Sequence, residues 1–309
     1  MNEEIKYYYP IEKEIVPEGY EIEYVEVPDR IYVIICKSLM SLIFTLTTIA
    51  GLQTYFGKDL LITIIDAFGL TLYFLLKLCY YKAINTSPGI VDNYVPIASS
   101  DELNSAIKRA LGGIAKECKT CDMNYRIRWC SKCERFRPPR SYHCKKCGAC
   151  IEKRDHHCPW ISNCVGKNNM KFFYQFLFYA ACALLVGSCI NGLSIYHTLK
   201  SYNNKEVGIV FHWSIITVIL PAAIATAIGL ALFVGMTVLF VNHTMNIKRN
   251  ETSMESIERS RLIMLNNNNE QLIRENIPSY DRGFLNNFKE IMGPNLIDWF
   301  FPISHKNYE

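Results

Sequence analysis

Residues 130–164 read CSKCERFRPPRSYHCKKCGACIEKRDHHCPWISNC and hold seven cysteines and three histidines. Thiolates and imidazoles at C-x2-C and H-C-x2-C-x2-C spacing are typical ligands of tetrahedral structural zinc. Two closed zinc sites need eight ligands, so ten candidates leave one cysteine and one histidine without a metal. The segment therefore predicts a zinc-stabilised platform that carries one further cysteine and histidine with another role.

The run Asp155-His156-His157-Cys158 indicates which residues have that other role. It places an acid, an imidazole and a thiol on neighbouring residues. A carboxylate that orients a histidine beside a cysteine is the general arrangement around a thiol nucleophile. The spacing alone does not decide whether His156 or His157 binds metal. We predict one reactive cysteine held on a rigid zinc-bound support.

Composition places this platform beside a membrane. Half of the 309 residues are hydrophobic and fall in long uncharged runs, and the net charge of +4 says little about nucleic acid. Thirteen cysteines are too few for a secreted disulfide scaffold. Nine of them lie between Cys118 and Cys164, which favours metal ligands and reactive thiols in the reducing cytosol. The acidic first thirty residues contain no apolar run, so we expect no cleavable signal peptide.

Four apolar runs are each long enough to cross a hydrocarbon core of ~30 Å at about 1.5 Å per residue. The second run contains Asp66, which we interpret as an interfacial or helix-paired carboxylate. We predict an all-α polytopic membrane protein with four transmembrane helices and a cytosolic zinc-stabilised cysteine-rich domain between helices 2 and 3. The predicted parts are a tail at 1–30, two helices in 31–81, a loop at 82–171 with the cysteine-rich core at 128–171, two helices in 172–241, and a tail at 242–309.

Basic residues predict the orientation of these helices. The 82–171 loop has seventeen Lys and Arg, whereas the short connections have only three Lys. Cationic residues favour the cytosolic side of a membrane, so we expect both termini and the cysteine-rich domain in the cytosol. The flanking cations on that side are Arg30, Lys82, Lys167, Lys171, Lys248 and Arg249.

The cysteine pattern resembles the DHHC family of protein S-acyltransferases. The resemblance covers the string from His143 through the Asp155–Cys158 run to Trp160, Asn163 and Cys164. Three motifs outside the cluster extend it. Residues 86–89, TSPG, look like the family's Asp-Pro-Gly motif with Ser87 in place of Asp. Residues 252–255, TSME, look like its Thr-Thr-x-Glu motif and also form a capping-box pattern. Residues 280–283, YDRG, with Asn287 and Gly293 resemble its C-terminal motif.

The resemblance implies a ligand set for each zinc. The first Zn²⁺ would take Cys130, Cys133, His143 and Cys150, and the second would take Cys144, Cys147, His157 and Cys164. This assignment leaves His156 and Cys158 free, in agreement with the count of ligands. Cys118 and Cys121 form a further C-x2-C pair, which we interpret as non-ligand cytosolic thiols, with a third metal site as the alternative.

The resemblance also implies a palmitoyltransferase activity with two structural zinc ions. His156, held by Asp155, would deprotonate Cys158, which would take the acyl group of a long-chain acyl-CoA such as palmitoyl-CoA. Arg137 and Arg140 are our candidates to bind the CoA phosphates; a solvated face or contact with anionic lipid is the alternative. The acyl acceptors would be cysteines of membrane-associated proteins.

Two other classes of protein share part of this pattern. A zinc scaffold without catalytic activity would share every metal ligand but would not need Asp155, His156 and Cys158. A RING-like ubiquitin ligase would spread its ligand pairs further apart. No recognition helix with C-x2-C…H-x3-H spacing is present, so we expect no nucleic-acid partner. The expected partners are acyl-CoA, substrate proteins, the lipid bilayer and, as a further candidate, an accessory subunit. The expected location is the Golgi or endoplasmic reticulum, with the plasma membrane as the alternative.

Overall fold

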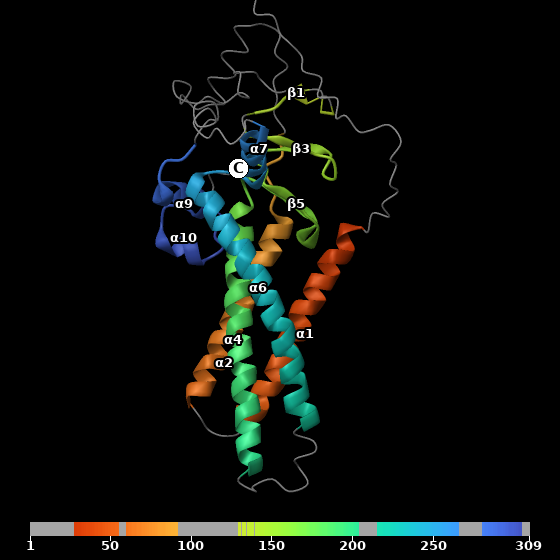
Figure 1. The fold of residues 1–309 in the computed structure, drawn as a ribbon, viewed down its shortest axis with the longest axis vertical. Helices are drawn as coiled ribbons and strands as arrows, with labels where there is room; N and C mark the ends of the chain where they lie inside the picture. Colours follow the sequence, from red (N-terminus) through yellow and green to blue (C-terminus); the bar gives the residue numbers. More distant parts are fainter. Residues whose placement is uncertain are drawn as a thin grey trace, which may run out of the picture.

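The structure is a computed structural model that describes residues 28–55, 60–91, 129–130, 132–133, 135–138, 140–203, 215–265 and 280–304. Four long helices form a trunk, and the strands gather at one end of it (Figure 1). The helices are α1 (Asp29–Tyr55), α2 (Leu60–Asn85), α4 (Met170–Asn203) and α6 (Leu220–Arg249), with a π-helical turn, η3 (Ile215–Ile219), ahead of α6. The structure does not describe Cys118, Cys121 or residues 1–27, so the predictions about them lie outside the described residues.

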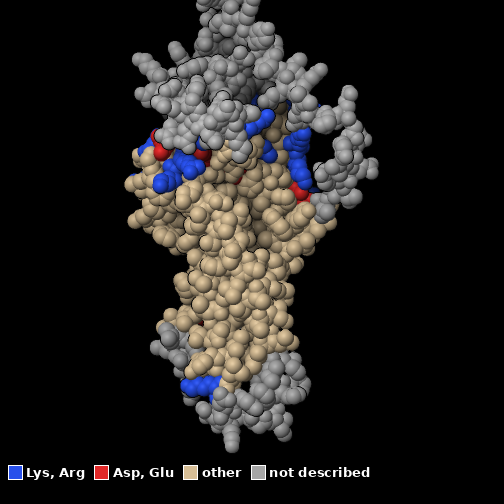
Figure 2. Space-filling model, viewed as in Figure 1, with Lys and Arg blue, Asp and Glu red and all other residues tan. Residues whose placement is uncertain are grey.

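All four helices carry an apolar segment long enough to span a membrane, which confirms the predicted fold class. On the face that Figure 2 shows, most Lys and Arg side chains lie at the strand end, and the trunk is almost bare of charge down to a small basic group at its far end. The last helix continues beyond the predicted boundary at 241 to Arg249. It ends where Asn250 adopts φ 49° and ψ 48°, a left-handed conformation that asparagine tolerates better than most residues. Asp29, predicted to lie in the tail, is the first residue of α1.

The central helix of the trunk is α4, which packs against α1, α2 and α6. Its buried face is aromatic near the strand end and includes Phe172, Phe173 and Phe176. Further along, α2 approaches closely, because a Cβ on Gly69 would lie 3.3 Å from the side chain of Ile190. Small residues permit such close packing where lipid gives no hydrophobic drive for helix association.

The cysteine-rich domain consists of three antiparallel hairpins rather than helices. Short β-hairpins of this size depend on cross-links for stability, because an isolated two-stranded hairpin is marginal in water. A single 3₁₀ turn, η2 (Pro159–Ile161), follows the fifth strand. The hairpins pair β1 (Trp129–Cys130) with β2 (Arg135–Phe136), β3 (Tyr142–Cys144) with β4 (Ala149–Ile151), and β5 (His156–Cys158) with β6 (Asn163–Val165).

Side-chain amides join this domain to the end of α2. The Asn163 amide donates to the carbonyl oxygen of Ile84 at 3.1 Å, in the last turn of the helix, and to that of Thr86 at 3.0 Å, just beyond its end. Gly166 lies against the loop that follows α2, since a Cβ there would come within 2.4 Å of the Pro88 carbonyl oxygen. The third hairpin therefore has a defined position relative to the trunk.

The C-terminal part folds back onto the trunk through α7 (Ser253–Leu265), α9 (Phe284–Met292) and α10 (Leu296–Phe300). The Gln175 amide on α4 donates to the carbonyl oxygens of Asp298, Trp299 and Phe301 at 3.1–3.2 Å. Buried Asn287 on α9 donates to the Lys248 carbonyl at 3.0 Å. These bonds hold the end of the chain against the helix bundle.

Candidate zinc centres and thiol active site

The first group of predicted zinc ligands converges in space. The ligand atoms of Cys130, Cys133, His143 and Cys150 all lie within 4.8 Å of one another. The Sγ atoms of Cys130 and Cys133 lie 3.6 and 3.3 Å from His143 Nδ1, and the Sγ atoms of Cys133 and Cys150 are 3.9 Å apart. Tetrahedral zinc, with bonds of about 2.3 Å to sulfur and 2.0 Å to nitrogen, requires ligand separations of roughly 3.5–3.8 Å.

The second group has the same geometry. His157 Nδ1 lies 3.5, 3.3 and 3.6 Å from the Sγ atoms of Cys144, Cys147 and Cys164. The Sγ atoms of Cys147 and Cys164 are 3.5 Å apart. Both groups therefore fit zinc in ligand type and in spacing. When bound, the ions would stabilise hairpins that have little apolar core of their own.

The direction of strand β5 decides which histidine is the ligand. Successive side chains of a strand point to opposite faces, so His157 faces one way and His156 and Cys158 face the other. His157 is paired across the hairpin with Cys164, and both belong to the second zinc group. One strand therefore holds a predicted metal ligand on one face and the predicted catalytic pair on the other.

The predicted acid, base and nucleophile lie together. His156 Nδ1 donates to Asp155 Oδ2 at 2.7 Å, and the Asp155 side chain is almost wholly buried. Burial lowers the pKa of His156, but hydrogen bonds with Asp155 and Cys158 outweigh burial and raise that pKa to about 9. Burial raises the pKa of Asp155, whereas its bonds to His156 and to the Ser253 amide lower it, and the net shift is downward.

Cys158 lies at the boundary between this polar pair and an apolar core. It is 5% exposed and belongs to a buried cluster with Tyr80, Phe173 and Phe176. The Tyr80 hydroxyl donates to the Trp160 carbonyl oxygen at 2.6 Å, which fixes the turn that follows the cysteine. A thiol in this position can reach a polar base while an apolar group attached to it enters the helix bundle.

Residues after α6 hold the Asp155 carboxylate. The Ser253 amide donates to Asp155 Oδ1 at 2.6 Å, and its hydroxyl donates to Oδ2 at 2.8 Å. The predicted capping box is present, because Thr252 N donates to Glu255 Oε2 at 2.8 Å and Glu255 N donates to Thr252 Oγ1 at 3.2 Å. The motif thus begins α7 and orients Asp155 at the same time.

Arg140 is engaged by the protein itself. Its guanidinium donates to both carboxylate oxygens of Glu255 at 2.8 Å, and to the side-chain and backbone oxygens of Asn250 at 3.0 and 2.8 Å. It also lies 4.2 Å from the centre of the Tyr280 ring. Arg137 is half-buried in the neighbouring segment. The phosphate contact expected for these two arginines stays a prediction, and Arg140 has a clear structural role.

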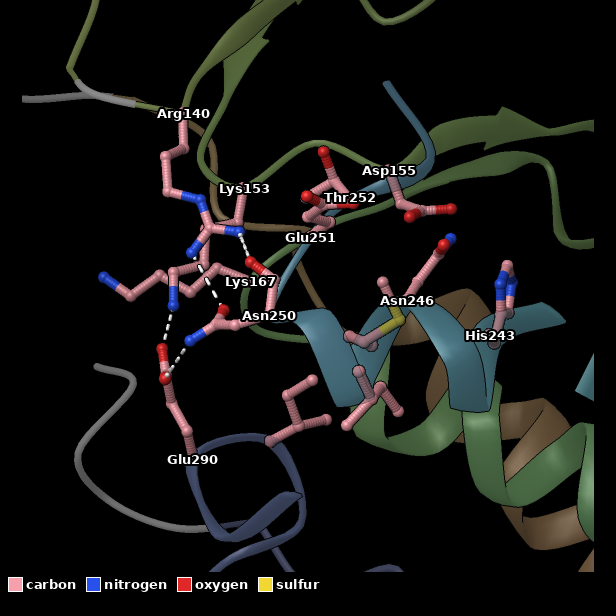
Figure 3. A pocket seen from close by; sticks show the side chains of 14 residues that line it. Arg140, Lys153, Asp155, Lys167, His243, Asn246, Asn250, Glu251, Thr252 and Glu290 are labelled. Carbon is pink, nitrogen blue, oxygen red and sulfur yellow. Dashed lines mark hydrogen bonds and ion pairs between the residues drawn. The ribbon is translucent and has the colours of Figure 1, made fainter. Parts of the chain in front are cut away.

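A cavity of about 170 Å³ lies next to Asp155. Figure 3 shows Arg140, Lys153 and Glu290 on one side of it and Asp155 and His243 on the other. The Asp155 carboxylate therefore borders this cavity, whose far side carries charged residues, whereas Cys158 borders the apolar core.

Sequence reasoning missed two residues at this site. His243 on α6 is 7% exposed, and its ring centre lies 5.8 Å from that of His156. Asp29 Oδ2 lies 2.6 Å from Nε2 of the predicted zinc ligand His157. A lone histidine just after an apolar run and an aspartate in the predicted N-terminal tail gave only weak signals, since neither position indicates a distant partner.

With this geometry established, sequence comparison identifies the class of protein. The sequence model of the DHHC palmitoyltransferase family matches residues 123–260. Together with relatives at 30% identity or more over most of their length, this match shows that the chain belongs to the DHHC palmitoyltransferase family.

Three of its relatives illustrate the similarity. Palmitoyltransferase PFA3 of Saccharomyces cerevisiae is 31% identical over 89% of this chain and 78% of the relative. Palmitoyltransferase PFA3 of Candida albicans is 30% identical over 82% and 71%, respectively. Probable protein S-acyltransferase 13 of Arabidopsis thaliana is 30% identical over 80% and 74%.

Proposed function

We propose that this protein is a protein S-acyltransferase that carries a long-chain acyl group on Cys158. The observation that carries the proposal is the hydrogen-bonded pair Asp155–His156 beside Cys158, on the face of β5 opposite the zinc ligand His157. A scaffold that only binds zinc would need none of these three catalytic groups. Family membership supports the same activity.

The reaction would have two steps. His156 accepts the thiol proton of Cys158, and the thiolate attacks the thioester carbonyl of acyl-CoA. The carbonyl–sulfur bond of CoA breaks, CoA leaves as a thiolate, and it takes the proton back from His156. In the second step a substrate cysteine gives its proton to His156 and attacks the acyl-Cys158 thioester, and Cys158 leaves as a thiolate that is reprotonated. One thioester replaces another at each step, so no other energy source is required.

The position of Cys158 supports a long-chain acyl donor. About 0.8 kcal/mol per buried methylene favours burial of the chain, and the apolar cluster around Tyr80 and Phe176 begins at the thiol. We propose that the chain enters the bundle there and that the CoA phosphates stay on the cationic side, where Arg137 is our first candidate contact.

We further propose that this side is cytosolic and that the acceptors are cysteines of proteins at the same membrane surface. The clustering of cations at the strand end supports that orientation. We also propose that the protein lies in an endomembrane and uses palmitoyl-CoA as an acyl donor, with an accessory subunit as a further candidate partner.

The decisive experiment compares wild type with Cys158→Ser in detergent. Both are incubated with labelled palmitoyl-CoA, and hydroxylamine-sensitive label and zinc content are measured on the protein. We expect label on wild type alone and about two zinc ions per chain in both. Zinc retained without label on either protein would favour the scaffold. Equal label on both would assign the chemistry to another thiol.

A further inference from the structure

The second zinc group has a partner from outside the cysteine-rich segment. Asp29 Oδ2 lies 2.6 Å from His157 Nε2, and its other oxygen, Oδ1, accepts from Lys146 Nζ at 3.1 Å. The Asp29 and His157 side chains are only 14% and 12% exposed. This contact joins the first residue of α1 to a strand 128 positions later in the sequence.

The arrangement defines the role of each imidazole nitrogen. His157 Nδ1 faces the three thiols at 3.3–3.6 Å, so the metal would bind there. Nε2 then carries the hydrogen and donates it to Asp29. A metal-binding histidine usually donates its second N–H to a carboxylate or carbonyl, which orients the ring and makes it a stronger ligand.

We propose that Asp29 is a positioning residue of the second zinc centre, through which the first transmembrane helix holds the strand that carries Cys158. The proposal depends on zinc at this centre, and it does not depend on the acyl transfer proposed above. The ion pair with Lys146 is too exposed to account for the contact, because the Lys146 side chain is 40% exposed and such pairs contribute little.

A second contact on α1 strengthens the link. One turn after Asp29, the Tyr32 ring packs edge-on against Trp160 with ring centres 5.3 Å apart. Trp160 lies in the turn directly after Cys158. The start of α1 therefore contacts the residue before Cys158 and the turn after it, so the nucleophile is held from both sides by the same helix.

The first zinc group provides an internal comparison. Within the described ranges, His143 has no carboxylate partner of this kind, whereas His157 has Asp29. Loss of the Asp29 carboxylate should therefore weaken one zinc centre and leave the other unchanged. A general loosening of the protein would affect both.

The test is the release of zinc from the purified full-length chain in detergent to the chromophoric chelator 4-(2-pyridylazo)resorcinol. We expect one of the two ions in Asp29→Ala to transfer roughly 10–100-fold faster than in wild type, as for other outer partners of zinc ligands. The second ion should keep its wild-type rate. In Asp29→Asn the release rate of the faster ion should lie between its rates in wild type and in Asp29→Ala, because the amide oxygen still accepts the bond without a charge. Lys146→Met is the matched control and should behave as wild type.

Trapping the freed thiols with N-ethylmaleimide, followed by mass spectrometry, identifies the centre that opens. Early modification of Cys144, Cys147 and Cys164 in Asp29→Ala supports the proposal. Wild-type release from Asp29→Ala would overturn it. So would equal acceleration of both ions, first modification at the other centre, or the same acceleration in Lys146→Met.

Discussion

Arg140 offers the sharpest test of the structure, because its side chain is predicted to have two different roles. The guanidinium forms four hydrogen bonds, two with Glu255 and two with Asn250, and the Arg140 and Glu255 side chains are only 8% and 15% exposed. Removal of one partner of a buried ion pair costs about 3–5 kcal/mol. At about 2–4 °C per kcal/mol for a chain of this order of size, Arg140→Ala should lower the Tm by roughly 10 °C.

The backbone supplies an additional check on this magnitude. Arg140 adopts φ 63°, a left-handed conformation that costs a residue with a Cβ about 1–2 kcal/mol. Arg140→Gly removes the same hydrogen bonds but also this backbone cost, so it should be less destabilising than Arg140→Ala by about 1 kcal/mol. Arg140→Lys keeps the charge without the bidentate geometry and should fall between wild type and Arg140→Ala.

The assay combines the Tm in detergent with the KM for palmitoyl-CoA in autoacylation. If the structural role dominates, the Tm falls in the order wild type, Lys, Gly, Ala, and the KM changes by less than about threefold. An unchanged Tm in Arg140→Ala together with a KM raised about tenfold would refute this reasoning. That result would support the phosphate contact predicted from the sequence.

Three further predictions concern the active site. Ser253→Ala removes one of the two bonds that Ser253 donates to Asp155, worth about 1.5 kcal/mol for a charged acceptor, so single-turnover autoacylation should slow about tenfold. Ser253→Thr should keep the wild-type rate, and equally slow Thr and Ala variants would contradict the role of the hydroxyl. Gly166→Ala forces a Cβ to within 2.4 Å of the Pro88 carbonyl; it should lower the Tm and the zinc content, and wild-type values for both would show that the loop can move. The pKa of His156 is raised to about 9 from 6.5, so its pairing with Asp155 stabilises the fold fully below about pH 6.5 and ceases to do so as the pH rises through 9. The stability advantage of wild type over His156→Gln, on the order of 1–2 kcal/mol after allowance for the partly exposed ring, should therefore disappear by about pH 10. A Tm difference between the two proteins that stays constant with pH would refute the pairing.

The grouping of the candidate site residues was predictable because these residues are close together in the sequence. Zinc ligands occur in closely spaced pairs, and the Asp155–Cys158 run places acid, base and thiol within four residues. The four membrane helices were predictable for a similar reason, since each apolar run must satisfy its own backbone hydrogen bonds in lipid. The resemblance to a known family then assigned each ligand to its metal.

Tertiary structure decided the contacts that join distant segments. The alternation of side chains along β5, anchored by pairing with β6, places His157 on the metal face and His156 beside Cys158. Asp29 reaches His157 because α1 packs beside the third hairpin, and Arg140 is drawn into the fold by Glu255, 115 residues later. Residue spacing carries no information about such pairs, because packing of whole helices and hairpins determines which side chains meet.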